Sequence, residues 1–169
     1  ARAIQTINAL SDYLRSTLPK LRRDVGQQST TLGEQVDISA LYLDLMKIRM
    51  GDRLSVTVDV SDDVRELAFP PLLMISLVEN AVKHGVEPKA GPAAIVIRAQ
   101  LHRHEQAARL QVDVVDDGVG LGEGMGAGVG LANIRAQLQH RFGDAAALTI
   151  EGLASGGVRA RILIPAEVA

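Results

Sequence analysis

Residue types that mark several common classes of protein are missing from this sequence. None of its 169 residues is cysteine or tryptophan, which excludes disulfide bonds and thiolate metal sites and fits the cytoplasm. The aromatic residues are two tyrosines and two phenylalanines, and no basic block occurs. Nucleic-acid binding by phosphate neutralisation and base stacking therefore has little support. The four histidines do not have the spacing of zinc ligands.

Long apolar runs are absent as well. The longest strongly apolar run covers residues 72–78, whereas a membrane helix needs about 20 apolar residues. The first residues do not resemble a signal peptide. Apolar residues make up 47% of the chain and the formal net charge is -2, which predicts one folded domain with or without an appendage. We expect a soluble, cytoplasmic chain, which can be part of a longer protein.

The first third of the sequence has helical periodicity. A helix is predicted at 3–18, and Thr31 and Glu34 have the spacing of a capping box before a second helix at 32–50. The second helix carries two opposite apolar stripes, one with Leu32, Val36, Leu43, Met46 and Met50 and the other with Ile38, Leu41, Leu45 and Ile48. A helix that is apolar on both sides needs two partners. We expect a dimerising helical hairpin, in which one partner is the first helix or a second subunit and the other is the following domain.

Period-two alternation begins after Gly51. Strands are predicted at 54–60, 95–101, 110–114, 148–151 and 158–164, and helices at 72–84 and 130–142, with a loop at 85–92. One face of every predicted strand is apolar, and the two helices can cover it. These patterns predict an α+β fold, a two-layer α/β sandwich with a mixed, mostly antiparallel sheet.

Glycine occupies every second position from Gly118 to Gly130. Such a repeat suits neither a helix nor a central strand, but it suits backbone that turns sharply or lies against a ligand. Asp116 and Asp117 precede it at the end of a predicted strand, and a predicted helix follows it. The arrangement predicts a nucleotide site built partly from backbone. A flexible connector is the alternative interpretation.

Asp116 continues the alternation of Leu110, Val112 and Val114, which points its side chain to the covered face of the sheet. A buried carboxylate needs a hydrogen-bond donor, and the exocyclic amine of a purine is one. The other interpretation is a turn in which the aspartate bonds its own backbone, as is common in Asp-Gly sequences.

The predicted helix at 72–84 places Ser76, Asn80, Lys83 and His84 on one face. The Asn80 amide oxygen can occupy one site on Mg²⁺ whose other ligands are phosphate oxygens and water. Lys83 can meet phosphate as a point charge, and Glu79 can accept a proton. A solvated helix end, with Lys83 and His84 complementing the helix dipole, explains the same residues.

Taken in order, these segments resemble a known family. Residues 77–85, Leu-Val-Glu-Asn-Ala-Val-Lys-His-Gly, resemble the N box of the GHKL ATP-binding superfamily, which includes gyrase, the mismatch-repair ATPases and histidine kinases. Residues 116–120 and 126–131 resemble its two glycine boxes, and residues 45–54, 70–73 and 130–135 are similar to the LytS-type sensor histidine kinases. The resemblance implies a Bergerat-type ATP-binding fold. Residues 1–50 would then be a helical hairpin, part of the dimerisation and phosphotransfer region, and residues 51–169 the catalytic domain.

The resemblance also implies roles for individual residues. Asn80 is expected to hold Mg²⁺, Lys83 and His84 to lie near the phosphates of ATP, and Glu79 and Lys83 to assist phosphoryl transfer. Asp116 is expected to bond the adenine amino group. The other residues of the expected ATP site bring backbone or a helix N-terminus close to the nucleotide: Gly118, Gly120, Gly126, Gly128, Gly130 and Leu131.

The sequence departs from the family pattern in three places. The GHKL hydrolases have a glutamate four residues before the asparagine, where this chain has Ser76. Only seven residues separate Gly120 from Gly128, which predicts a very short lid over the nucleotide. The LytS-type phosphoacceptor lies in a segment resembling His-Phe-Leu-Phe-Asn, and this segment would fall upstream of residue 1. We therefore expect no autophosphorylation by the chain as given.

The resemblance implies a two-component histidine kinase that transfers the γ-phosphate of ATP to an upstream histidine. It further implies a response regulator as partner, a homodimer in the full-length protein and a membrane-anchored sensor upstream. One alternative is a nucleotide-gated interaction module of the anti-sigma-factor type. Another is a GHKL hydrolase, which Ser76 disfavours.

Overall fold

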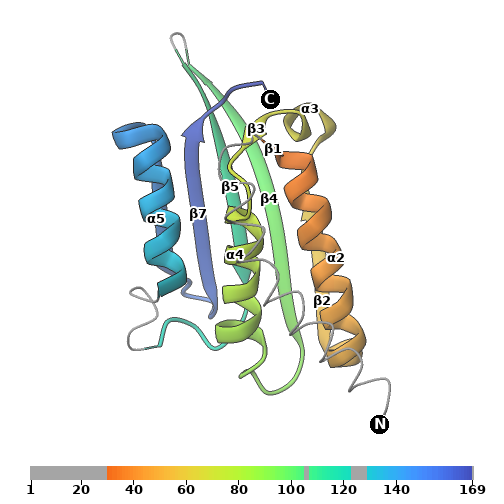
Figure 1. Ribbon diagram of the computed structural model, residues 1–169. Helices are drawn as coiled ribbons and strands as arrows, with labels where there is room; N and C mark the ends of the chain where they lie inside the picture. Colours follow the sequence, from red (N-terminus) through yellow and green to blue (C-terminus); the bar gives the residue numbers. More distant parts are fainter. Residues whose placement is uncertain (1–29, 105–106, 123–128, 169) are drawn as a thin grey trace.

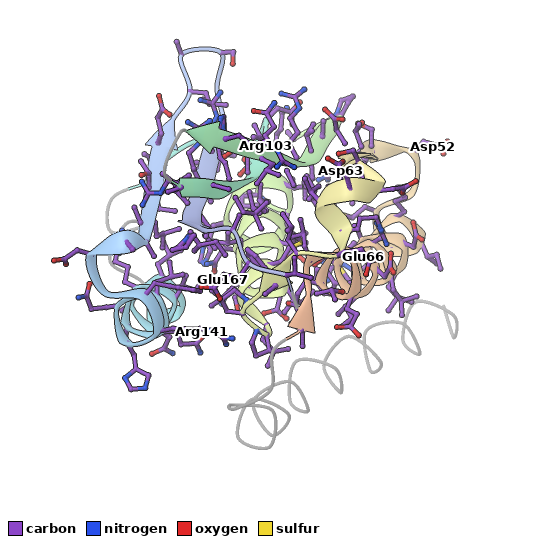
Figure 2. All side chains as sticks on the ribbon, turned by 90° about the horizontal axis from the view of Figure 1, so that it is seen from above. Asp52, Asp63, Glu66, Arg103, Arg141 and Glu167 are labelled. Carbon is purple, nitrogen blue, oxygen red and sulfur yellow. The ribbon has the colours of Figure 1, made fainter. Side chains whose placement is uncertain are left out.

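Three helices cover one face of a five-stranded sheet. The computed structural model describes residues 30–104, 107–122 and 129–168. Helices α2 (Leu32–Met50), α4 (Leu73–Asn80) and α5 (Val129–Phe142) form one layer, with α4 between the other two (Figure 1). Figure 2, seen from above, shows the strands as the second layer. The predicted two-layer sandwich is confirmed, and the helix predicted at 3–18 lies outside the described residues.

The sheet has the order β2-β4-β5-β7-β6, formed by Leu54–Asp59, Ala93–His104, Ala107–Asp116, Val158–Pro165 and Ala147–Gly152. β2 pairs with β4 in parallel and all other neighbours pair antiparallel, as predicted for a mixed, mostly antiparallel sheet. The centre of the apolar face is fully buried beneath the helices and is formed by Ile95, Ile97, Leu110, Val112, Ile162 and Ile164. The opposite face is polar and carries a bidentate ion pair between Asp113 and Arg161, at 2.8 and 2.9 Å.

The two stripes predicted on α2 lie on opposite sides of the helix. The capping box is present: Glu34 N–H donates to Thr31 Oγ1 at 3.1 Å, and Thr31 N–H donates to Glu34 Oε2 at 2.9 Å. Leu43 is fully buried and Leu41 is 64% exposed. The buried stripe packs against α4 and β2 and belongs to the same core as the sheet. The division of the chain between residues 50 and 51 stays a prediction.

The helix predicted at 72–84 differs from the observed one at both ends. Leu72 has a left-handed backbone with φ of 65°, and α4 begins one residue later. Helical structure continues beyond His84 as a π-helical segment, η2 (Ala81–Val86), in which Glu87 N–H bonds Val82 O at 2.9 Å. The predicted loop therefore begins two residues later than expected, because the wider π-helical turns carry the helix past Gly85.

Several short elements have too few residues for a periodic pattern. They are the 3₁₀ segments η1 (Gly51–Arg53) and η4 (Gly143–Ala145), helix α3 (Asp62–Arg65), and the strands β1 (Thr30–Thr31) and β3 (Ala68–Phe69), which pair antiparallel. The C-terminal segment joins this small sheet, because Ala68 N–H donates to Glu167 O at 2.7 Å. None of the helices in the described ranges is both long and apolar enough to span a membrane.

Candidate functional site

The candidate site is centred on the carboxylate at the end of β5. Asp116 is 4% exposed, as its position in the alternating strand predicts. Its Oδ1 accepts a hydrogen bond from Gly118 N–H at 2.8 Å. The side chain therefore lies on the covered face, as predicted, and also bonds its own turn, as the alternative interpretation expects. The hydrogen bond to a purine amine stays a prediction.

The surroundings of Asp116 make its negative charge costly. Burial raises the pKa of Asp116, while hydrogen bonds from the backbone of Gly118 and Val158 act in the opposite direction. The neighbouring Asp117 raises this pKa further and Lys89 lowers it. Lys89 Nζ lies 3.1 Å from Asp117 Oδ1, which also accepts Ala94 N–H at 2.7 Å. A ligand with an N–H donor would relieve the unfavourable burial of the Asp116 charge.

Backbone segments approach Asp116 so closely that only glycine fits. A Cβ on Gly85 would lie 2.4 Å from Asp116 Oδ1, and a Cβ on Gly118 would lie 2.3 Å from the carbonyl carbon of Gly85. Val119 N–H donates to Gly85 O at 3.2 Å, which joins the two segments. The end of η2 and the turn after β5 therefore form one backbone wall beside the carboxylate.

A third segment, the turn between β6 and β7, closes the wall from the other side. A Cβ on Gly157, which has φ of 87°, would lie 2.0 Å from the carbonyl oxygen of Asp116. Gly120 has φ of 85°, and a Cβ there would lie 4.0 Å from Gly157 N. Gly157 lies between the strands predicted at 148–151 and 158–164, and nothing local in the sequence indicates which distant backbone it touches.

The polar end of α4 lies beside the first turn of α5. Asn80 is the last residue of α4 and is half-buried, and a Cβ on Gly130 would lie 3.6 Å from Asn80 Nδ2. The fold thus brings Gly130, from the second glycine box, next to the asparagine of the N box. The N–H groups in the first turn of a helix have no partner within the helix and attract anions.

The other predicted site residues take different positions. Lys83 and His84 are exposed on η2, Glu79 is half-buried, and the side chain of Leu131 is 6% exposed and belongs to the core. Only the backbone of Leu131 can therefore face a ligand. Gly126 and Gly128 lie outside the described residues.

Ser76 occupies the position where hydrolases of this superfamily have glutamate. Its hydroxyl donates to Leu72 O at 2.8 Å, and the residue is 6% exposed. A serine that bonds the preceding turn of its own helix is a poor proton acceptor for an attacking water. The local structure therefore does not favour water activation at this position.

The donor set at Asn80 fits a metal that is held largely by its nucleotide. In the part of the chain that the structure describes, no group of three or more histidine, aspartate or glutamate side chains is placed to hold a metal ion. Mg²⁺ commonly takes one or two protein oxygens and completes its shell with phosphate oxygens and water. The amide oxygen of Asn80 can supply such a ligand.

The fold is that of solved histidine kinase catalytic domains. The solved catalytic domain of the histidine kinase ThkA superposes with a TM-score of 0.59 at 17% identity, over 82% of this chain and 94% of that domain. Residues 1–54 match the family model described as histidine kinase.

Curated relatives indicate which type of histidine kinase the chain resembles. The sensor histidine kinase YesM of Bacillus subtilis is 30% identical over 164 residues, which cover 94% of this chain and 27% of YesM. The sensor protein LytS of Enterococcus faecalis is 28% identical over 181 residues, which cover 98% of this chain and 29% of LytS. Over nearly its whole length the chain is similar to sensor histidine kinases of the LytS and YesM type, and it spans between a quarter and a third of these relatives' length.

Proposed function

We propose that this chain is the ATP-binding catalytic region of a sensor histidine kinase, and that it transfers the γ-phosphate of ATP to a histidine upstream of residue 1. The observation that carries the proposal is the proximity of Gly130 to the Asn80 amide, which a Cβ at Gly130 would contact at 3.6 Å. It brings together the two sequence boxes that the family uses for phosphates. Asp116 lies beside the backbone wall formed by Gly85 and Gly118 and offers a buried carboxylate for a base.

Each part of the site suits one part of the nucleotide. The Asp116 carboxylate, which accepts a hydrogen bond from Gly118 N–H, would accept another from the adenine amino group. The first turn of α5 and the exposed Lys83 and His84 would bind the phosphates. Glu79 would assist phosphoryl transfer by accepting a proton.

Mg²⁺ would be held by Asn80 together with phosphate oxygens. When bound, the ion would neutralise charge that develops on the transferring phosphoryl group. The protein's own contribution is then to position the nucleotide. Phosphoryl transfer requires little covalent chemistry from the enzyme, so this set of residues is sufficient.

The whole kinase would act in the cytoplasm as a homodimer and pass its phosphate to a response regulator. The exposed stripe of α2, with Ile38 at 44% and Ile48 at 63% exposure, is compatible with a further helical partner in the longer protein. None of the observations above favours the anti-sigma-factor alternative. The hydrogen bond from Ser76 to Leu72 O argues against the hydrolase alternative.

Calorimetry and radiolabelled ATP would test this function in two stages. The chain is expected to bind ADP in a Mg²⁺-dependent manner, and Asp116→Asn is expected to weaken binding by about 10–100-fold, the loss of one charge-assisted hydrogen bond. A longer version of the protein that includes the upstream histidine should acquire label on that histidine. Absence of nucleotide binding by the wild-type chain, with no difference in the variant, would refute the proposal. Sustained phosphate release without labelling would instead support a hydrolase.

A further inference from the structure

A buried glutamine connects the start of α4 to strand β1. Gln35 lies on α2 and is 3% exposed. Its Oε1 accepts the backbone N–H of Leu72 at 2.9 Å, and its Nε2 donates to Thr30 Oγ1 at 3.3 Å. The Thr30 hydroxyl donates to Phe69 O at 2.8 Å. One side-chain amide therefore joins strand β1, helix α2 and the first residue before α4.

Leu72 is the residue that depends most on this connection. Its φ of 65° is a left-handed conformation, which is uncommon for a residue other than glycine. Pro70 and Pro71 precede it and have no N–H group, and Leu72 caps α4 without a side-chain cap of its own. Because Leu72 is 8% exposed, its N–H would be buried and unsatisfied without Gln35.

The backbone of Leu72 is joined to the helix that ends at Asn80. The carbonyl oxygen of Leu72 accepts both Ser76 N–H at 3.2 Å and Ser76 Oγ at 2.8 Å, so the first turn of α4 is firmly joined to it. Asn80 lies eight residues further along the helix, about 12 Å at the usual rise per residue. Asp116, by contrast, lies on β5, which takes no part in these hydrogen bonds.

We propose that Gln35 is a positioning residue for nucleotide binding. It sets the distance between Asn80 and Asp116, and it makes this distance depend on the position of strand β1. The inference rests on the proposed function, since it assigns Asn80 to the phosphate end and Asp116 to the adenine end. A displacement of strand β1 would therefore reach the start of α4, the helix that ends at Asn80, through Thr30 and Gln35.

Two variants and one matched control separate this role from general stability. Gln35→Met removes both hydrogen bonds at similar side-chain volume, and Thr30→Val removes one hydroxyl. Ser39→Ala is the control, because Ser39 is fully buried on the same helix and its Oγ has no hydrogen-bond partner within the described ranges. Calorimetry on the complete chain would compare the Kd of Mg·ADP with that of adenosine, which lacks phosphates. Gln35→Met is expected to weaken Mg·ADP binding about tenfold and adenosine binding less than about twofold.

Nuclear magnetic resonance of the nucleotide-free chain supplies an independent readout. The side-chain amide signals of Asn80 are expected to shift in Gln35→Met and Thr30→Val and to stay in place in Ser39→Ala. Unchanged Asn80 signals would overturn the proposal. So would an equal loss of affinity for adenosine and for Mg·ADP that accompanies a lower Tm. If the wild-type chain binds no nucleotide, the proposed function fails, and the Asn80 signals still decide whether Gln35 positions this residue.

Discussion

Gly157 lies so close to the backbone of Asp116 that a Cβ at Gly157 would be 2.0 Å from the Asp116 carbonyl oxygen. In the sheet register, Asp116 is opposite Val158, the residue that follows this glycine. The turn between β6 and β7 therefore folds directly over the end of β5. The position of the Asp116 carboxylate depends on a glycine that is distant in the sequence and carries no functional group.

Gly157→Ala is expected to lower the free energy of unfolding by about 3 kcal/mol, from overpacking against Asp116 added to the strain of a left-handed alanine. Gly156→Ala is the matched control, because Gly156 has φ of 92° and a Cβ there would have no atom of the described residues within 4 Å. It is expected to cost only the strain, about 1–2 kcal/mol. Urea denaturation would measure both values. Equal losses would show that the contact with Asp116 does not matter.

The buried carboxylate of Asp116 makes stability depend on pH. Because its folded-state pKa is raised, the folded protein binds more protons than the unfolded chain between the two pKa values. Stability from this group therefore falls as the pH rises from about 3.9, the ordinary aspartate pKa, through the raised folded value. In the variant Asp116→Asn the side chain does not titrate, so this decrease in stability with rising pH is removed.

Urea denaturation of both proteins at several pH values would test this sign. The free energy of unfolding of Asp116→Asn minus that of the wild type is expected to increase with pH across the window and then to level off. The stability of the variant relative to the wild type is therefore expected to be higher at neutral pH than in acid. The variant is still expected to bind nucleotide less tightly than the wild type. A difference that stays constant with pH would contradict the predicted titration.

Asn80→Ala is expected to abolish the dependence of ADP affinity on Mg²⁺, because the proposed protein ligand is lost. Lys83→Met is the comparison, and it is expected to weaken ADP binding because Lys83 acts as a point charge on phosphate. Addition of Mg²⁺ is still expected to increase the ADP affinity of this variant. Calorimetric titrations with and without Mg²⁺ would give the ratio of the two Kd values for each variant. A ratio that Asn80→Ala leaves unchanged would remove this residue from the metal site.

The two sides of α2 are expected to respond differently to truncation. Leu43 is fully buried against the core, so Leu43→Ala is expected to lower the free energy of unfolding by about 2–5 kcal/mol. Leu41 is 64% exposed, and Leu41→Ala is expected to stay within about 0.5 kcal/mol of the wild type. Chemical denaturation of the two variants would make the comparison. Similar losses would mean that both stripes are covered in the chain.

Local patterns predicted much of this molecule correctly. Thr31 and Glu34 marked the start of α2, because a capping box involves residues only three apart. Alternation along β5 placed Asp116 on the covered face, because side chains in a strand point to opposite faces in turn. The second glycine box and Asn80 were assigned to one site by their resemblance to a family, and the fold places Gly130 against Asn80.

The predictions were less accurate where a residue depends on a distant partner. The helix at 72–84 was predicted from its apolar residues, but the left-handed Leu72 is stabilised by Gln35, which lies 37 positions earlier in the sequence. The pairing of β1 with β3 involves two residues on each side, too few for any periodic signal. Gly85 was recognised as part of a motif, whereas its contact with the Asp116 carboxylate is a property of the fold.

Sequence patterns were enough to determine the layers of the fold and the covered face of each strand, and they predicted which residues would bind a base, a phosphate or a metal. These properties follow from hydrophobic periodicity and from the chemistry of side chains within a few residues of one another. The folded chain was needed to establish that α2 shares the core of the sheet, that Gln35 holds Leu72, and that Gly157 closes over Asp116. Each of these depends on backbone from separate elements coming within a few ångströms, and only the packing of the whole chain fixes such distances.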